Sequence, residues 1–139
     1  MNSGMGNSKV AVITGGASGI GAAIARQLGT QQMRIVIADI DAQAASLTVD
    51  SLKAAGVQAT AVAVDVTSPE SIAAAFATVR DTCGGCDVLV NCAGIAKTYP
   101  FLEFPLENWQ RTLDVNLTGA MLCSQHAARL MVPRGWGRI

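Results

Sequence analysis

The sequence predicts an α/β protein with a parallel, doubly wound sheet. Strands are predicted at 10–13, 34–38, 57–64 and 86–90, and the first of them is wholly apolar without alternation, which is typical of a strand buried on both faces. Segments with helical spacing separate them, and a glycine-rich turn joins the first strand to the first helix. Strands and helices that alternate in this way form a parallel sheet with right-handed crossovers, here in the order 3-2-1-4.

Length and composition indicate one globular domain of 139 residues, half of them hydrophobic and 14% charged. Ten basic residues balance ten acidic ones, so the sequence gives no electrostatic support for binding nucleic acid or an anionic membrane. Residues 1–8 are expected to form a flexible tail ahead of a dinucleotide-binding domain at 9–139. With no signal-peptide pattern or apolar run of membrane-spanning length, the sequence predicts a cytoplasmic protein.

Apolar stripes and cap residues define the three helices between the strands. In the first helix, apolar residues recur at helical spacing at Ile20, Ile24 and Leu28. The apolar stripes of the other two helices are Ala45, Val49 and Leu52 in the second and Ile72, Ala75, Phe76 and Val79, expected to be buried, in the third. Asp41 and Ser68 have the side chains of N-caps, and Pro69 suits the first position of its helix. Gly56 ends the second helix.

The glycine-rich turn is predicted to bind the phosphates of a nucleotide. It reads Thr-Gly-Gly-Ala-Ser-Gly-Ile-Gly over residues 14–21. Gly15 permits the tight turn, Gly19 lets a pyrophosphate approach the backbone, and Gly21 lets the helix lie close to the strand. The helix N-terminus adds free N–H groups and the positive end of a dipole. A flexible loop is the alternative, whereas a P-loop is excluded because no Gly-Lys-Ser/Thr follows.

The spacing of these glycines resembles that of one family. Three residues separate Gly15 from Gly19, and Thr-Gly-x-x-x-Gly-Ile-Gly is the form found in short-chain dehydrogenases/reductases. The resemblance extends from Lys9 to Ile139, although this covers only the cofactor-binding half of a typical member. It implies a Rossmann-like fold and reversible hydride transfer between a nicotinamide and a carbonyl or hydroxyl carbon. The candidate cofactor contacts in the turn are Gly15, Ser18, Gly19, Ile20 and Gly21.

Asp39 ends the second predicted strand, about two dozen residues beyond Gly15. A carboxylate at this place can accept hydrogen bonds from the hydroxyls of the adenosine ribose, and it would repel a 2′-phosphate. Ser18 and Ile40 stand where a basic residue would meet that phosphate. The sequence therefore predicts NAD rather than NADP. The structural alternative for Asp39 is to cap the next helix, which Asp41 can also do.

Two further strand ends carry candidate cofactor contacts by the same resemblance. Asp65 and Val66 follow the third strand, where the family places the adenine ring. There the carboxylate accepts from the exocyclic amine and the next backbone N–H reaches a ring nitrogen. The segment 91–94, Asn-Cys-Ala-Gly, resembles the family's Asn-Asn-Ala-Gly with Cys92 in the second place. The candidates in this segment, expected beside the cofactor ribose, are Asn91, Ala93 and Gly94.

A long helical pattern from Leu106 to Met131 contains a candidate catalytic residue, Asn116. Asn is unfavourable inside a helix, and an amide on an apolar face needs hydrogen-bond partners. The expected stripe around it consists of Leu113, Asn116, Ala120, Cys123 and Ala127. Asp-Val-Asn-Leu at 114–117 resembles the family segment whose Asn carries a water-linked proton relay. An Asn that satisfies a distortion of the helix is the alternative.

The catalytic Ser and Tyr-x-x-x-Lys of the family have no counterpart in the sequence. Tyr99, the single tyrosine, lies in the loop at 97–105 and has Glu103 four residues on. Residues 137–139 resemble the start of the fifth strand that leads to those residues in the family. We therefore expect a fold that is incomplete at its C-terminus, and the cofactor-binding part of an NAD-dependent oxidoreductase that is inactive alone. The alternative is a non-catalytic nucleotide-binding module.

The family resemblance also implies partners, and the cysteines carry a second, weaker signal. The complete protein is expected to act on a small molecule and to form a homo-oligomer through the long helix, as family members usually do. Cys83-Gly-Gly-Cys86 has the spacing of a redox motif, and Cys123 and His126 lie one helical turn apart. A zinc site would need a second tight pair, which the sequence lacks, so we expect no metal.

Overall fold

The computed structural model describes residues 8–139, so the predicted tail at 1–8 lies almost entirely outside the described residues. Four strands form one parallel sheet in the order β3-β2-β1-β4, as predicted. The strands are β1 (Val10–Thr14), β2 (Arg34–Asp39), β3 (Ala59–Ala63) and β4 (Val88–Asn91). The last two are shorter than the ranges predicted for them.

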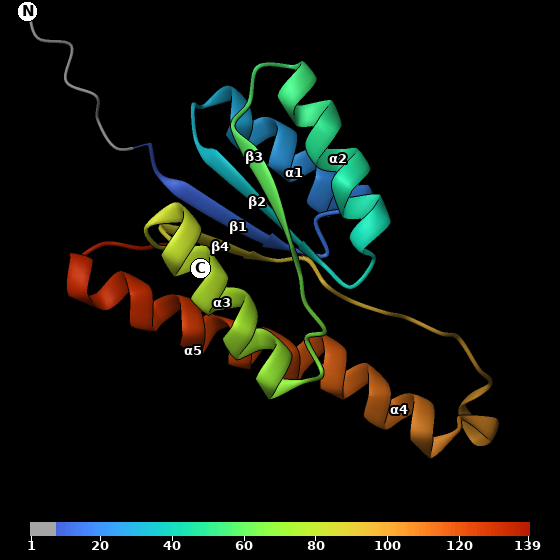
Figure 1. The fold of residues 1–139 in the computed structure, drawn as a ribbon. Helices are drawn as coiled ribbons and strands as arrows, with labels where there is room; N and C mark the ends of the chain where they lie inside the picture. The colour runs from blue at the N-terminus through green and yellow to red at the C-terminus, as the bar shows by residue number, and fades with distance from the viewer. Residues whose placement is uncertain (1–7) are drawn as a thin grey trace, which may run out of the picture.

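Helices cover both faces of the sheet (Figure 1). One face packs against α1 (Gly19–Thr30) and α2 (Ala42–Ala54), and the other packs against α3 (Pro69–Cys83) and α5 (Ala120–Met131). Alternate residues of β1 and β2 point to the two layers, and every residue from Val10 to Thr14 is buried. This two-sided burial explains why these strands are continuously apolar.

The helix α1 forms where the spacing predicts it, but the apolar residues that show this spacing are not the ones that it buries. Ile20 is 76% exposed, and Ile24 and Leu28 are only half-buried. The residues of α1 that are buried are all small: Gly21, Ala22, Ala25 and Gly29. Small side chains let the helix lie close to the sheet, so its larger apolar residues flank the contact instead of forming it.

The next two helices begin and pack as predicted. Asp41 accepts a hydrogen bond from the Ala44 N–H at 2.9 Å, and Ser68 accepts one from the Ser71 N–H at 3.2 Å. All seven apolar residues of the predicted stripes of α2 and α3 are buried. The cap role considered for Asp39 therefore belongs to Asp41.

The long helix is continuous but distorted. It consists of α4 (Leu106–Leu113), the π-helical segment η2 (Asp114–Gly119) and α5, and the 3₁₀ turns η1 (Phe101–Glu103) and η3 (Val132–Arg134) flank it. Its buried residues recur every four positions: Val115, Gly119, Cys123, Ala127 and Met131. Asn116 is exposed, and Leu113 and Ala120 are half-buried. The expected stripe was wrong at these three positions, because the wide π turn shifts the helical repeat.

The C-terminal residues lie beside β4. Arg138 forms a parallel bridge with Val88, and the Leu89 N–H donates to the Arg138 carbonyl oxygen at 2.9 Å. The guanidinium of Arg134 contacts Asp87 at 3.2 Å, next to the start of the same strand. Residues 137–139 thus occupy the position that the sequence predicted for a fifth strand. None of the helices within residues 8–139 is long and apolar enough to cross a membrane.

Candidate cofactor-binding site

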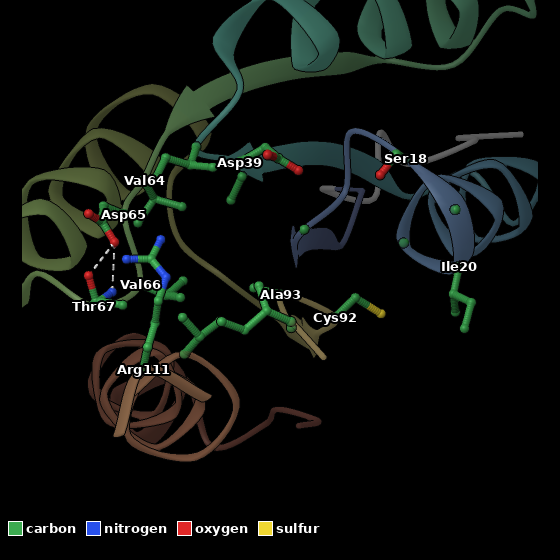
Figure 2. Close-up of a pocket in the computed structure, with 18 residues that line it drawn as sticks. Ser18, Ile20, Asp39, Val64, Asp65, Val66, Thr67, Cys92, Ala93 and Arg111 are labelled. Carbon is green, nitrogen blue, oxygen red and sulfur yellow. Dashed lines mark hydrogen bonds between the residues drawn. The ribbon is translucent and has the colours of Figure 1, made fainter. Parts of the chain in front are cut away.

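A cavity of about 430 Å³ lies at the carboxyl edge of the sheet. Residues that follow β1, β2, β3 and β4 line it, together with residues of α4 and η2 (Figure 2). The predicted site residues among them are Gly15, Ser18, Gly19, Ile20, Gly21, Asp39, Ile40, Asp65, Val66, Ala93 and Gly94. Asn91 and Asn116, also predicted, do not line the cavity.

The glycine-rich turn is held against the end of β4. Gly15 has φ +62°, and a Cβ at this position would lie 2.7 Å from the Ala93 backbone nitrogen. Thr14 fixes the same two segments, because its hydroxyl donates to the Val90 carbonyl oxygen at 3.4 Å and accepts from the Ala93 N–H at 3.2 Å. Only glycine fits this crossing of two backbones.

The N-terminus of α1 opens into this cavity without a side-chain cap. Ser18 occupies the N-cap position, but its side chain makes no capping hydrogen bond, whereas α2 and α3 both have such caps. Gly19 has φ +51°, and a Cβ there would meet no atom within 4 Å. The first-turn N–H groups and the open space beside Gly19 fit an anionic group such as a pyrophosphate.

Asp39 fixes the conformation of the glycine-rich turn. One carboxylate oxygen accepts from the Ala17 N–H at 3.0 Å, and the other accepts from the Asp41 N–H at 3.0 Å. Ala17 is also held at its carbonyl oxygen, which accepts from the Thr48 hydroxyl at 2.9 Å. A carboxylate has about four acceptor positions, so Asp39 retains capacity to accept from two further donors in the cavity.

Asp65 and Thr67 form a second polar group at the cavity. One oxygen of Asp65 accepts from the Thr67 hydroxyl at 2.7 Å and from the Thr67 N–H at 2.9 Å. These hydrogen bonds, with a smaller contribution from the charge of Arg111, lower the pKa of Asp65 below 3.8. Asp65 is therefore ionised at neutral pH and its other oxygen can accept a hydrogen bond.

The two asparagines that lie outside the cavity support its wall. The Asn91 amide donates to the Ser124 hydroxyl of α5 at 3.1 Å, so it ties the end of β4 to that helix. The Asn116 amide donates to the Ile95 carbonyl oxygen, and the Ile95 N–H donates back to Asn116, both at 2.8 Å. Ile95 itself lines the cavity.

Sequence reasoning missed three polar residues of the cavity: Cys92, Thr67 and Arg111. Cys92 lies inside the Asn-Cys-Ala-Gly segment, where the resemblance marks it only as a departure from the family pattern. Thr67 lies two residues after Asp65, a spacing that allows a local hydrogen bond to the carboxylate. Arg111 comes from α4, and no local signal indicated that this helix would reach the cavity.

The cysteines are free thiols, and the two at the redox-motif spacing differ in environment. Burial, with the nearby charge of Asp87, raises the pKa of Cys86 to about 12. A redox dithiol requires the opposite shift, because the thiolate is the reactive form. Within residues 8–139 the structure shows no group of three His, Cys, Asp or Glu side chains that could hold a metal ion.

The sheet order, the glycine-rich turn and the acids at its carboxyl edge define a Rossmann-type α/β protein. The family model described as short chain dehydrogenase matches residues 9–139, and the chain belongs to this family. An uncharacterized oxidoreductase of Thermotoga maritima is 42% identical over 131 residues, which cover 94% of this chain and 51% of that protein.

Two further proteins are similar to the chain, one with a named activity and one with a solved structure. The 5-keto-D-gluconate 5-reductase of Escherichia coli K12 is 42% identical over 92% of this chain and 50% of its own length. A crystal structure of a short-chain type dehydrogenase/reductase from Mycobacterium marinum matches with a TM-score of 0.90 and 34% identity, over 95% of this chain and 54% of that one. The chain therefore spans about half the length of these relatives.

Proposed function

We propose that these residues form the cofactor-binding part of an NAD-dependent oxidoreductase that acts on a small carbonyl or hydroxyl compound. One observation carries the proposal: the uncapped N-terminus of α1 and the Asp39 carboxylate line the same cavity. A pyrophosphate and a ribose diol are adjacent in a dinucleotide and need these two kinds of partner. When bound, the nicotinamide supplies the hydride chemistry, and the protein orients it.

Each part of the cavity has a role in this proposal. The first-turn N–H groups of α1 bind the pyrophosphate, and Asp39 accepts from the ribose hydroxyls. Asp65 and the Val66 N–H hold the adenine. The segment 93–94 lies against the second ribose. Asn116 positions this segment through Ile95 and, as the family resemblance implies, supports a proton relay.

Residues 1–139 alone are proposed to bind the cofactor without catalysing its oxidation or reduction. Tyr99 accepts a hydrogen bond from the Asn108 amide at 3.1 Å and packs edge-on against Phe104, outside the residues that line the cavity. Four residues on, it has Glu103, where the family's catalytic Tyr has a Lys. General acid catalysis therefore has no evident donor among these residues.

Calorimetric titration with NADH tests the proposed site directly. The wild-type chain should bind NADH, and Gly19→Asp should abolish binding because it places a carboxylate beside the uncapped helix end. Gly56→Asp is the matched control, since Gly56 also has positive φ and open space but follows the C-terminus of α2, outside the residues that line the cavity. Binding that survives in Gly19→Asp would contradict the proposal.

Turnover distinguishes the oxidoreductase from a non-catalytic nucleotide-binding module. The protein as its gene encodes it should oxidise NADH with a member of a panel of keto sugar acids and 3-oxoacyl thioesters, or reduce NAD with a member of a panel of polyols. Binding without turnover of any carbonyl would favour the module.

We also propose that the protein assembles as a homo-oligomer through the outer face of the α4–α5 helix. Leu117 is 65% exposed and Met121 48% exposed, and Trp109 on α4 is 55% exposed. Exposed apolar residues grouped on one helix indicate a contact surface. Leu117→Lys combined with Met121→Lys should reduce the mass measured by light scattering to that of a monomer, whereas an unchanged mass would exclude this face.

A further inference from the structure

Arg111 is the only basic side chain among the residues that line the cavity. It extends from α4 to the end of the cavity that Asp65, Val66 and Thr67 also line. Figure 2 shows its guanidinium group beside Val66, on the side of the cavity opposite the glycine-rich turn. Its place is therefore separate from the turn that suits the pyrophosphate.

The guanidinium of Arg111 is not engaged by the protein. The ion pairs within residues 8–139 are Arg80 with Asp81 and Arg134 with Asp87, and Arg111 takes part in neither. Its side chain also makes none of the hydrogen bonds found in this part of the chain, although it is close enough to Asp65 to lower the pKa of that acid. A planar cation without a partner is available to a ligand in the cavity.

The chemistry around Arg111 selects the part of the ligand that it would meet. Asp65 and the Val66 N–H present an acceptor and a donor, which suit the edge of a purine ring. Val64 and Val66 offer apolar surface at the same end. A guanidinium stacks on aromatic rings and holds them by a cation–π contact. A phosphate at this end would instead meet the negative charge of Asp65.

We propose that Arg111 covers the adenine group of the bound cofactor and sets the affinity for adenine-containing ligands. The proposal rests on the proposed function, because it assumes a dinucleotide in this cavity. It adds a residue from α4 to a site that is otherwise built from strand ends and the glycine-rich turn.

The test uses the protein as its gene encodes it, and measures the dissociation constants of NADH, AMP and adenosine 2′,5′-bisphosphate by calorimetry. Arg111→Gln should weaken all three by a similar factor, about 2- to 30-fold for the loss of one cation–π contact. Arg111→Lys should keep part of the affinity, since an ammonium retains the charge but not the planar stacking. Arg129→Gln, an exposed substitution on α5, should change none of them.

The outcomes separate this proposal from its alternatives. Unchanged binding of AMP in Arg111→Gln would overturn it, as would a loss confined to the bisphosphate, which would assign Arg111 to a 2′-phosphate. A thermal midpoint that falls together with affinity would assign it to stability instead. A wild-type protein that binds AMP but not NADH would contradict the proposed function, while the AMP comparison would still test Arg111.

Discussion

The Asn116 side chain and the Ile95 peptide group form a reciprocal pair in which each donates one hydrogen bond to the other at 2.8 Å. The pair joins η2 to the segment that follows β4, 21 residues earlier in the chain. It explains why an Asn stands inside the distorted helix, since an amide carries both the donor and the acceptor that one peptide group requires. The side chain still has a second N–H and further acceptor capacity.

Removing this pair should loosen the wall of the cavity. Asn116→Ala deletes two hydrogen bonds, each worth about 0.5 to 1.5 kcal/mol, and we expect a loss of about 1 to 3 kcal/mol in the free energy of unfolding. Asn116→Asp should restore only the bond from the Ile95 N–H. Urea unfolding measures the stability of the two variants, and the exposed substitution Thr118→Ala is the control. If both Asn116 variants were as stable as the wild type, the pair would contribute nothing to stability.

Asp39 should determine the preference between the two nicotinamide cofactors. In an active protein, Asp39→Ala removes the acceptor for the ribose hydroxyls and the charge that opposes a 2′-phosphate. We expect the ratio of kcat/KM for NAD to that for NADP to fall at least about tenfold, since hydrogen bonds to a charged group contribute about 1.5 to 3 kcal/mol.

The control must account for the second role of Asp39, which fixes the Ala17 N–H. Thr48→Val is this control, because it removes the hydrogen bond to the Ala17 carbonyl oxygen without changing any charge. This variant should lower kcat/KM for NAD and for NADP by a similar factor. A wild-type preference for NADP would contradict the assignment of Asp39.

Gly119 should tolerate no larger side chain. A Cβ at this position would lie 2.7 Å from the Val66 carbonyl oxygen, so alanine would push η2 away from the strand end that carries Asp65. Overpacking of this kind costs about 1 to 3 kcal/mol. Gly119→Ala should therefore lower the thermal midpoint and weaken AMP binding together, and a variant that keeps both values would show that the helix can shift freely.

The hydrogen bond from Thr67 should make stability depend on pH in the acid range. The pKa of Asp65 is lowered in the folded protein, chiefly by this hydroxyl, so the contribution to stability is present above about pH 4 and is lost as pH falls through the lowered pKa. Thr67→Val should destabilise the protein at pH 6, by less than about 1 kcal/mol because the pair is exposed to solvent. The difference should shrink as pH falls through the lowered pKa of Asp65, and a difference that does not change with pH would contradict the role of Asp65.

The sheet could be predicted because its signals are local. Buried strands such as β1 are apolar throughout. The glycine-rich turn, the acid at Asp39 and the cap at Asp41 can be identified because each lies at a fixed position after a strand. The strand order follows from the crossover rule and the family resemblance, and the structure has the same order.

The parts that sequence could not place depend on packing between distant segments. Which face of α1 is buried depends on how closely the helix lies on the sheet. The close approach buries its small residues and leaves Ile20 exposed. The register of the long helix depends on the π turn at 114–119, and a single extra residue in one turn is not visible in the apolar spacing. Arg111 lines the cavity beside Asp65, Val66 and Thr67, which are far from it in the chain, so only the tertiary packing brings them together.

The four cysteines provide a test of the cavity that needs no enzyme assay. Burial raises the pKa of Cys86 to about 12 and that of Cys123 to about 11, both from 9.0. At pH 8 their thiolate fractions are then about 10⁻⁴ and 10⁻³, so both should resist alkylation. Cys83 and Cys92 are half-buried and should react first.

A bound nucleotide should separate the two reactive thiols. Cys92 lines the cavity, whereas Cys83 lies at the C-terminus of α3, outside the residues that line it. Saturating NADH should therefore slow the alkylation of Cys92 by iodoacetamide at least about tenfold, as a site that is more than nine-tenths occupied requires, and leave the rate at Cys83 unchanged. Peptide mass spectrometry follows both rates in one sample, so Cys83 is the internal control. Equal rates at Cys92 with and without NADH would mean that the nucleotide does not occupy this cavity, and equal protection of both thiols would indicate a general stabilisation of the fold instead of contact at the site.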